Sequence, residues 1–196
     1  MVPEAPLHKT EEGIVPGVAG WFVVNAREAR WRERPGRGFS LPLSGWSDEE
    51  CETYFTQLGV NLVVLGPGEP MSSYHWETDS EAFLVISGEP LLIIEGQERP
   101  LKQWDYFHCP PQTNHVIVGA GNGPSVVLAM SSRQYMATPE WGGYTADETP
   151  ARHNASVERD TTDPGDAYER FGGSQPTPYR DGWLGHGEQI PHAAFS

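Results

Sequence analysis

Short apolar runs separated by Gly, Pro and Asn recur through the middle of the chain and restrict what it can fold into. They lie at 61–65, 82–87, 91–95, 105–109, 115–118 and 125–130. Each run is rich in Val, Ile, Leu and aromatic residues, is too short for a typical helix, and ends at turn-forming residues. Evenly spaced short strands are typical of a sandwich or barrel, and the jelly roll is one such solution that limits exposed edges. Residues 58–131 are therefore predicted to form an all-β, jelly-roll barrel.

The segments on either side of this barrel differ from it in composition. Residues 1–57 predict an N-terminal arm with one or two strands, one of them at 21–25, and a short helix at 47–55. Residues 132–196 are rich in Gly, Pro, Asp and Thr, and they predict an extended C-terminal tail with one helical turn at 164–170. The chain is thus expected to fold as one domain, a barrel with an arm at each end.

The charge balance excludes some classes of partner. The chain has 27 acidic and 13 basic side chains and a formal net charge of −14. This excess disfavours binding to a nucleic-acid backbone or to an anionic membrane surface. The sequence also contains no apolar run of membrane-spanning length and no signal peptide at its start. Its two cysteines, Cys51 and Cys109, form no CxxC pair. We expect a cytoplasmic protein with neither nucleic-acid nor membrane partners.

Two histidines and two glutamates in the barrel region have the spacing of a metal site. His75 and Glu77 are two residues apart, so they share one face of an extended segment. Glu81 begins the next apolar run, where a hairpin would bring it beside them, and His115 begins a later run. Imidazole and carboxylate groups on adjacent strands suit a divalent ion with positions open for water or substrate. The alternative is a solvated strand face with no metal.

The same residues resemble the first of two sequence motifs of the cupin superfamily, G-x5-H-x-H-x(3–4)-E-x6-G. The matching positions are Gly68, His75, Glu81 and Gly88. Gly68 lies one residue further from His75 than the motif asks, and Glu77 stands at the position of the second His. The longer interval of the motif would instead place Tyr74 and Trp76 at ligand positions. Neither is a good metal ligand, so we prefer the register that uses Glu77.

The second cupin motif, G-x5-P-x-G-x2-H-x3-N, is matched less fully. Pro110 and His115 are kept, whereas Gln112 and Gly119 replace the inner Gly and the final Asn. The resemblance covers residues 61–131, and the whole run resembles the small single-barrel cupins of bacteria. It implies the double-stranded β-helix, or jelly-roll, fold. It also implies that His115 completes a divalent metal site with the residues of the first motif.

The resemblance gives a predicted ligand set of His75, Glu77, Glu81 and His115. Two carboxylates would neutralise a divalent ion, which favours Fe, Mn or Zn. Glu77 has two alternative roles, as an acid that orients a ligand or as a general base on metal-bound water. We also expect a homodimer, because the arms and exposed edges of a small sandwich are commonly covered by a second copy.

The leading functional hypothesis is a metal-dependent enzyme that acts on a small oxygenated or sugar-like molecule, by isomerase, lyase or dioxygenase chemistry. A non-catalytic small-ligand-binding or sensory module is the alternative, and a purely structural barrel is a third. No catalytic residue outside the ligand set is indicated. Four aromatic residues are candidates for an apolar wall, namely Tyr74, Trp76, Phe83 and Trp104.

An arginine-rich stretch precedes the barrel. Its members are Arg27, Arg30, Arg32, Arg34 and Arg37. A solvated edge paired with Glu28 and Glu33 is the simplest interpretation. However, the barrel region itself has only the bases Arg99 and Lys102, so an anionic substrate would have to find its positive charge in the metal or in this arm.

Overall fold

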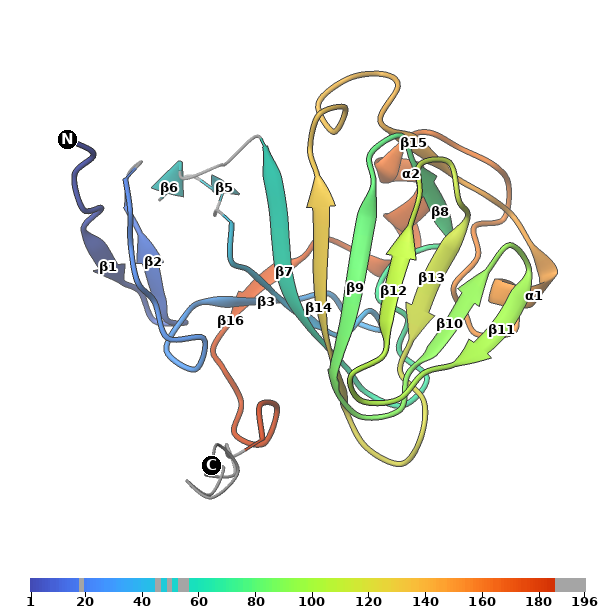
Figure 1. Cartoon of the computed structure of the whole chain (residues 1–196), viewed down its shortest axis with the longest axis horizontal. Coiled ribbons are helices and arrows are strands. Elements are labelled where there is room, and N and C mark those ends of the chain that lie inside the picture. The colour runs from blue at the N-terminus through green and yellow to red at the C-terminus, as the bar shows by residue number, and fades with distance from the viewer. Residues whose placement is uncertain (18–19, 45–46, 49–50, 53–56, 186–196) are drawn as a thin grey trace, which may run out of the picture.

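Two antiparallel β-sheets dominate the structure, a computed structural model that describes residues 1–17, 20–44, 47–48, 51–52 and 57–185 (Figure 1). The larger sheet contains, in spatial order, β12 (Tyr106–Cys109), β9 (Glu81–Ser87), β14 (Ser125–Ser132), β7 (Leu58–Leu65), β4 (Phe39–Pro42), β3 (Trp31–Glu33) and β16 (Gln175–Thr177). The smaller sheet contains β11 (Gln97–Pro100), β10 (Leu91–Ile94), β13 (His115–Val118), β8 (His75–Glu77) and β15 (Gly142–Tyr144). The predicted all-β jelly-roll fold is confirmed.

The remaining elements are small. Two hairpins are formed by β1 (Leu7–Lys9) with β2 (Ile14–Pro16) and by β5 (Ser47–Asp48) with β6 (Cys51–Glu52). The helices of the described residues are α1 (Glu148–Ala151), α2 (Pro164–Tyr168) and the 3₁₀ turn η1 (Glu169–Phe171). Asp147 and Asp163 cap the N-termini of α1 and α2 by accepting backbone hydrogen bonds from Thr149 and Gly165. No helix in the described parts of the chain has the length and apolar character that a membrane crossing requires.

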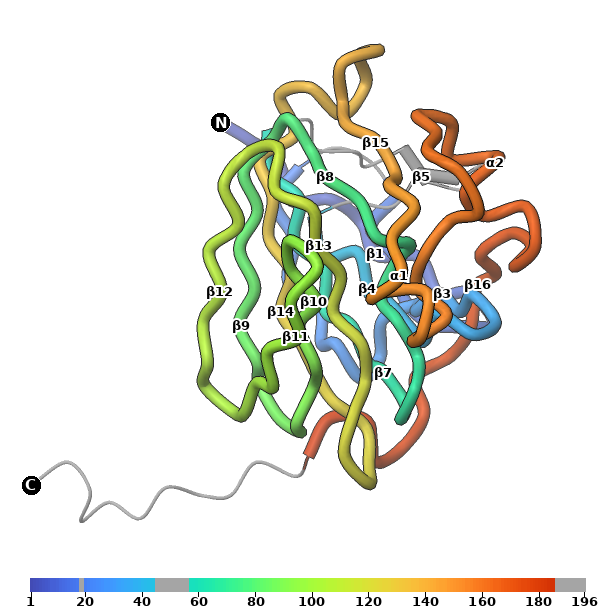
Figure 2. The backbone as a smooth tube through the Cα atoms, turned by 90° about the vertical axis from the view of Figure 1, so that its right-hand side faces the viewer, coloured from blue at the N-terminus to red at the C-terminus, as the bar shows by residue number. Residues whose placement is uncertain are grey.

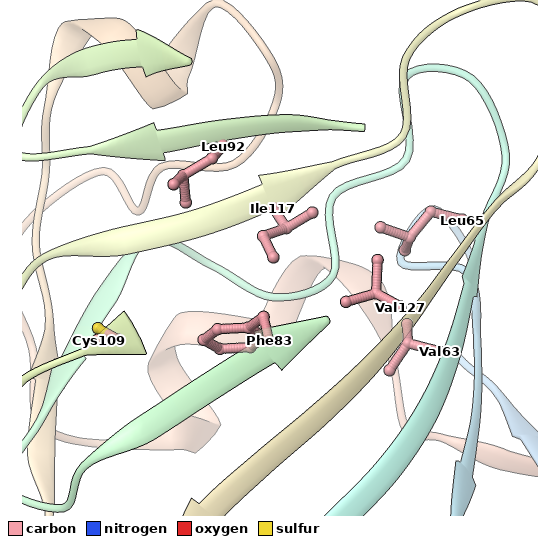
Figure 3. Packing of buried hydrophobic residues seen from close by; sticks show 7 residues of the cluster. All are labelled: Val63, Leu65, Phe83, Leu92, Cys109, Ile117 and Val127. Carbon is pink, nitrogen blue, oxygen red and sulfur yellow. The ribbon is translucent and has the colours of Figure 1, made fainter. Parts of the chain in front are cut away.

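The barrel interior is an apolar core between the two sheets. Because neighbouring residues of a strand point to opposite faces, alternate residues of each strand reach this core. Its buried members are Val63, Leu65, Phe83, Leu92, Cys109, Ile117 and Val127. Figure 3 shows these side chains, contributed by strands of both sheets, pointing toward one another. Burying each of the larger ones stabilises the fold by about 1.5–3 kcal/mol, so this core fixes the positions of the strands.

The outer faces of both sheets are also covered in part. On the smaller sheet, Val116 and Val118 of β13 pack with Tyr74 and Ala155, which lies beyond α1. On the larger sheet, Val64 and Val126 pack with Trp31 and its neighbours. The flanking segments also extend the sheets, since β15 pairs with β8 and β16 with β3 (Figure 2). The arm and the tail thus cover part of the outer face of each sheet, whereas β11 and the outer face of β12 stay exposed.

Two predictions for the N-terminal segment are wrong. Within the described residues, 21–25 is not a strand, apart from one bridge from Trp21 to Glu4. Instead, the carbonyl of Asn25 accepts the amides of Glu28 and Ala29 and begins a turn. The helix predicted at 47–55 is a hairpin where it is described, because Ser47–Asp48 pairs with Cys51–Glu52 across strands. Residues 49–50 and 53–56 lie outside the described residues. The predicted homodimer and cytoplasmic location stay predictions.

Candidate metal centre

Three of the four predicted ligands meet at one end of the barrel. His75 in β8 and His115 in β13 are directly opposite one another in register, with ring centroids 4.8 Å apart. Glu81 begins β9 in the other sheet, and it shares the inward face of that strand with Phe83. One candidate ligand atom from each of the three residues lies within 4.8 Å of the others. The strands therefore hold two imidazoles and a carboxylate around one point.

Backbone carbonyls fix the orientation of both histidine rings. Nδ1 of His75 lies 2.8 Å from the carbonyl oxygen of Ser73, and Nδ1 of His115 lies 3.0 Å from that of Thr113. Since a carbonyl oxygen can only accept, each Nδ1 donates and carries the proton. In each neutral ring, Nε2 therefore keeps its free lone pair. This is the arrangement in which a histidine binds a metal through Nε2 while its other nitrogen is held by the protein.

Two hydrogen-bond acceptors, one from His115 and one from Glu81, face each other at the centre. Nε2 of His115 and Oε2 of Glu81 lie 3.2 Å apart, but neither atom has a properly aligned hydrogen-bond partner among the described residues. Both are buried, since the side chains are 2% and 11% exposed. A neutral imidazole nitrogen and a carboxylate oxygen are both acceptors, so only a proton or a cation can hold them this close. The residues present therefore fit a divalent cation.

The pKa values of this pair shift in opposite directions. Burial opposes the ionisation of Glu81, but the close interaction with His115 outweighs burial and lowers the pKa of the Glu81 carboxyl. Burial likewise opposes protonation of His115, but Glu81 outweighs it and raises the pKa of the imidazole. In the absence of a cation, the pair thus tends to hold a proton where a metal ion would bind.

Glu77 lies beside this group rather than within it. Its Oε1 is 3.7 Å from Nε2 of His75, and its side chain is 24% exposed. It shares the face of β8 with His75, as the two-residue spacing predicts. Its backbone carbonyl accepts the amide of Gln112, which ties β8 to the turn before His115. The structure thus places Glu77 next to the three converging residues, with a carboxylate more open to solvent than that of Glu81.

The centre opens into a pocket of about 270 Å³. Its lining combines the three converging residues with an apolar wall and a few hydroxyl and amide groups, namely Ser40, Asn61, Val63, Met71, Ser72, Phe83, Val116, Ile117 and Ala129. Of the four aromatic residues predicted for the wall, only Phe83 is among the residues that line it. Tyr74 is buried elsewhere, where its hydroxyl accepts the amide of Gly96, and Trp104 is 65% exposed. The volume suits a small molecule.

Cys109 adjoins His115 but is unsuited to binding the cation. Its Sγ lies 3.4 Å from Nδ1 of His115, the nitrogen that faces away from the centre. Burial raises the pKa of the Cys109 thiol to about 12, with Glu81 and Glu77 acting in the same direction. Because the thiolate is the form that binds metals, this cysteine serves as a small apolar core residue.

Sequence reasoning did not identify the carbonyls of Ser73 and Thr113 or the pocket residues Asn61 and Met71. Backbone carbonyls have no residue-specific signal, so only the fold could locate them. Asn61 interrupts the apolar pattern of β7, where a polar residue at an internal strand position is a usable signal. Met71 precedes β8 in a loop, and no periodicity applies to it.

Comparison with protein-family models agrees with this fold. A family model described as "Cupin domain" matches residues 61–131. No curated protein matches the chain. Solved structures with similarity include a sugar phosphate isomerase of a cupin superfamily from Silicibacter pomeroyi, with 28% identity, a TM-score of 0.43, and coverage of 50% of this chain and 60% of the other. This chain thus spans less than two thirds of that protein.

Two further solved structures are similar at lower identity. KdgF from Halomonas sp. is 19% identical with a TM-score of 0.44, over 53% of this chain and 87% of the other. The DMSP lyase DddQ from Ruegeria pomeroyi is 21% identical with a TM-score of 0.42, over 52% and 49%. At these TM-scores, none of the three likenesses assigns a function. The strand arrangement and the family match agree that residues 61–131 form a cupin domain.

Proposed function

We propose that this protein is a metal-dependent enzyme that acts on a small oxygenated or sugar-like substrate, by isomerase, lyase or dioxygenase chemistry. The divalent ion, Fe, Mn or Zn, would be held by His75, Glu81 and His115, with Glu77 as a fourth ligand. The observation that carries the proposal is the buried pair of acceptors, Nε2 of His115 and Oε2 of Glu81, at the end of a small-molecule pocket. A bound ion would supply Lewis-acid polarisation of a substrate hydroxyl or carbonyl oxygen.

The protein's own residues would bind and shield the substrate. Asn61 and Ser72 offer hydrogen bonds to hydroxyl groups from the pocket wall. Phe83 and Ile117 supply apolar surface beside them, which limits water around the reacting oxygen. Orientation of both histidines by backbone carbonyls keeps the ligand geometry rigid during binding. The pocket thus combines a cation site with a partly dry surface for a small polar molecule.

Elemental analysis of protein purified without a His tag tests the cation site. Wild type and His75→Ala should be compared, with His108→Ala as the matched control because His108 is an exposed histidine on β12. We expect about one divalent ion per chain in wild type and in the control, and loss of that ion in His75→Ala. Absence of metal from wild type after reconstitution with Fe, Mn and Zn would overturn the proposal.

A second candidate function is a binding module that holds its ligand without turnover. It is favoured by the lining of the pocket: among the residues that the structure describes, the titratable side chains of that lining are His75, Glu81 and His115. A proton-transfer residue separate from the ion's ligands is therefore missing from that lining. Oxygen consumption and product analysis with catechols, diols and keto sugars separate the candidates. Turnover supports the enzyme, whereas saturable binding without turnover supports the module.

A further inference from the structure

A second hollow, of about 180 Å³, adjoins the pocket of the metal centre. Ser40, Val63 and Met71 line both hollows, so the two share a wall. The far side of the second hollow is formed by Arg34, Arg37, Gly38, Tyr168 and Ser174. Two members of the arginine-rich stretch therefore reach the neighbourhood of the candidate metal centre.

Arg37 is a buried cation whose partners are all neutral. The residue is 4% exposed. Its Nη1 donates to the carbonyl of Asn154 at 3.0 Å, its Nη2 donates to Oγ of Ser73 at 3.3 Å, and its guanidinium lies 3.9 Å from the ring centroid of Phe171. Its buried Nε has no hydrogen-bond partner among the described residues. A guanidinium buried in this way is normally paired with an acid, and here no described carboxylate pairs with it.

Arg34 adds a second cation without an acid. Its guanidinium lies over the Tyr168 ring, 4.1 Å from the centroid, and within the described part of the chain its side chain forms no ion pair. Burial is the main cause that lowers the pKa of Arg37 to about 10; the positive charges of Arg170 and Arg34 act in the same direction, and Tyr168 opposes them. Arg37 still stays protonated at neutral pH. Two positively charged side chains, Arg34 and Arg37, thus line this hollow, and no described acidic residue lines it.

We propose that Arg34 and Arg37 form an oxyanion subsite that binds the acid group of the substrate. The planar fork of a guanidinium matches the oxygens of a carboxylate or a phosphate, and a phosphate or carboxylate would supply the missing acceptor for Nε of Arg37. This assignment rests on the proposed function and narrows its substrate class. The substrate would be a small hydroxy or oxo compound that carries an acid group, with its neutral oxygen directed to the metal centre.

A structural role explains only part of this arrangement. The hydrogen bonds of Arg37 to Asn154 and Ser73 hold the tail against the barrel. They do not account for the unpartnered Nε of Arg37 or for the guanidinium of Arg34, which lies over the Tyr168 ring. Arg34 is also half-buried rather than buried. Its substitution is therefore the better test, because the fold depends on it less.

Calorimetric titration with inorganic phosphate and with acetate, at constant ionic strength, tests the subsite. The proteins are wild type, Arg34→Gln, Arg37→Lys and the control Arg99→Gln, which removes one exposed positive charge from β11. We expect saturable binding of at least one anion to wild type and to the control. Arg34→Gln should weaken it about tenfold or more, which is the loss of one charge-assisted hydrogen bond. Arg37→Lys, which keeps the charge but not the fork, should weaken it as well.

The outcomes separate this proposal from the metal proposal. Phosphate binding alone indicates a phosphoester substrate, and acetate binding indicates a carboxylic acid. Failure of wild type to bind either anion, or equal binding by Arg34→Gln with an unchanged circular dichroism spectrum, would overturn the subsite. His115→Ala should lose metal yet still bind the anion, whereas Arg34→Gln should keep its metal. If His115→Ala keeps its metal while Arg34→Gln loses the anion, only the metal proposal fails.

Discussion

The two adjoining hollows form the two ends of one larger pocket, the metal end and the arginine end, and these ends differ in their chemistry. At one end, Glu81 and His115 present buried acceptors that lack a donor. At the other end, Arg34 and Arg37 present donors that lack an acid. Both arrangements destabilise the folded protein, because buried polar groups without hydrogen-bond partners have lost their hydration. A cation would supply the missing partner at the metal end, and an anion would supply it at the arginine end.

The two ends also differ in what holds them. The acceptors lie on β8, β9 and β13, whose register is fixed by backbone pairing and by the inner core. The arginines lie on the turn between β3 and β4, where the amide of Arg34 donates to the carbonyl of Gly38. This turn is completed by side chains and carbonyls of the tail. We therefore expect the metal end to tolerate disturbance of the tail better than the arginine end.

The largest expected effect on stability is that of Glu81→Gln in the metal-free protein. The lowered pKa of Glu81 means that its contribution is present above its ordinary pKa of 4.5 and is lost as the pH falls through its folded pKa. The raised pKa of His115 means that its contribution is full below 6.5 and is lost as the pH rises through its folded pKa. The pair thus stabilises most between about pH 4.5 and 6.5.

Urea unfolding with EDTA at pH 5.5 and pH 9 measures this effect. Glu81→Gln should lower the free energy of unfolding by about 1.5–3 kcal/mol at the lower pH, the range for hydrogen bonds to charged groups. At the higher pH, the loss should shrink, because the glutamine amide can donate to the neutral Nε2 of His115. The same loss at both pH values would contradict the proposed proton-holding pair. Glu89→Gln, on an exposed loop, is the control.

Glu77→Gln measures how far the metal end extends. If Glu77 contributes to binding, the change should weaken metal affinity by about 10–100-fold, as expected for a group that ligates directly or orients a ligand. Competition with a chelator of known affinity gives the ratio, again with Glu89→Gln as the matched control. An affinity equal to that of wild type would leave His75, Glu81 and His115 as the whole protein ligand set.

Ser73→Ala tests the residue that connects the two ends. Oγ of this buried serine accepts from Arg37, and its backbone carbonyl accepts from Nδ1 of His75. Oγ also donates to the carbonyl of Ala167 at 3.4 Å. The substitution removes both contacts of Oγ and leaves the backbone carbonyl in place, so we expect a loss of about 1–2 kcal/mol in unfolding free energy and weaker anion binding. Metal content should stay that of wild type. Loss of metal would contradict this expectation, because it would show that the Ser73 side chain, and not only its backbone carbonyl, supports the metal end. Ser80→Ala, which is exposed, is the control.

The strands of the barrel could be predicted because local pattern determines them. The run 115–118 is β13, and the run 82–87 differs from β9 by one residue. Strand β15, Gly142–Tyr144, has little apolar pattern of its own and owes its conformation to pairing with β8. Sequence periodicity cannot report such a partner. Periodicity also misled the prediction for 21–25. Apolar residues of this segment pack against the core around Trp31, but the segment does not form a strand.

The two ends of the pocket differ in the same way. His75, Glu81 and His115 lie in strands, so spacing and the motif resemblance were enough to predict that they meet. Arg37 reaches its place through a contact with Asn154, a residue 117 positions later in the chain. From the sequence, the arginine-rich stretch could be described only as a charged edge or as a source of positive charge. In the folded chain, two of its five arginines, Arg34 and Arg37, line the pocket.

The smallest expected effect concerns Gln112, which replaces the inner glycine of the second motif. Its φ is +63°, in the left-handed region where a side chain costs about 1–2 kcal/mol. Glycine removes this strain but adds about 0.5–1 kcal/mol of entropy cost on folding. Gln112→Gly should therefore raise the free energy of unfolding by up to about 1 kcal/mol in urea titration. The backbone N–H of residue 112 donates the hydrogen bond to the Glu77 carbonyl, so glycine keeps this bond and the metal end should keep its affinity for the ion. A loss of stability would mean that the exposed Gln112 side chain holds this turn, and the metal end would then depend on a loop as the arginine end does.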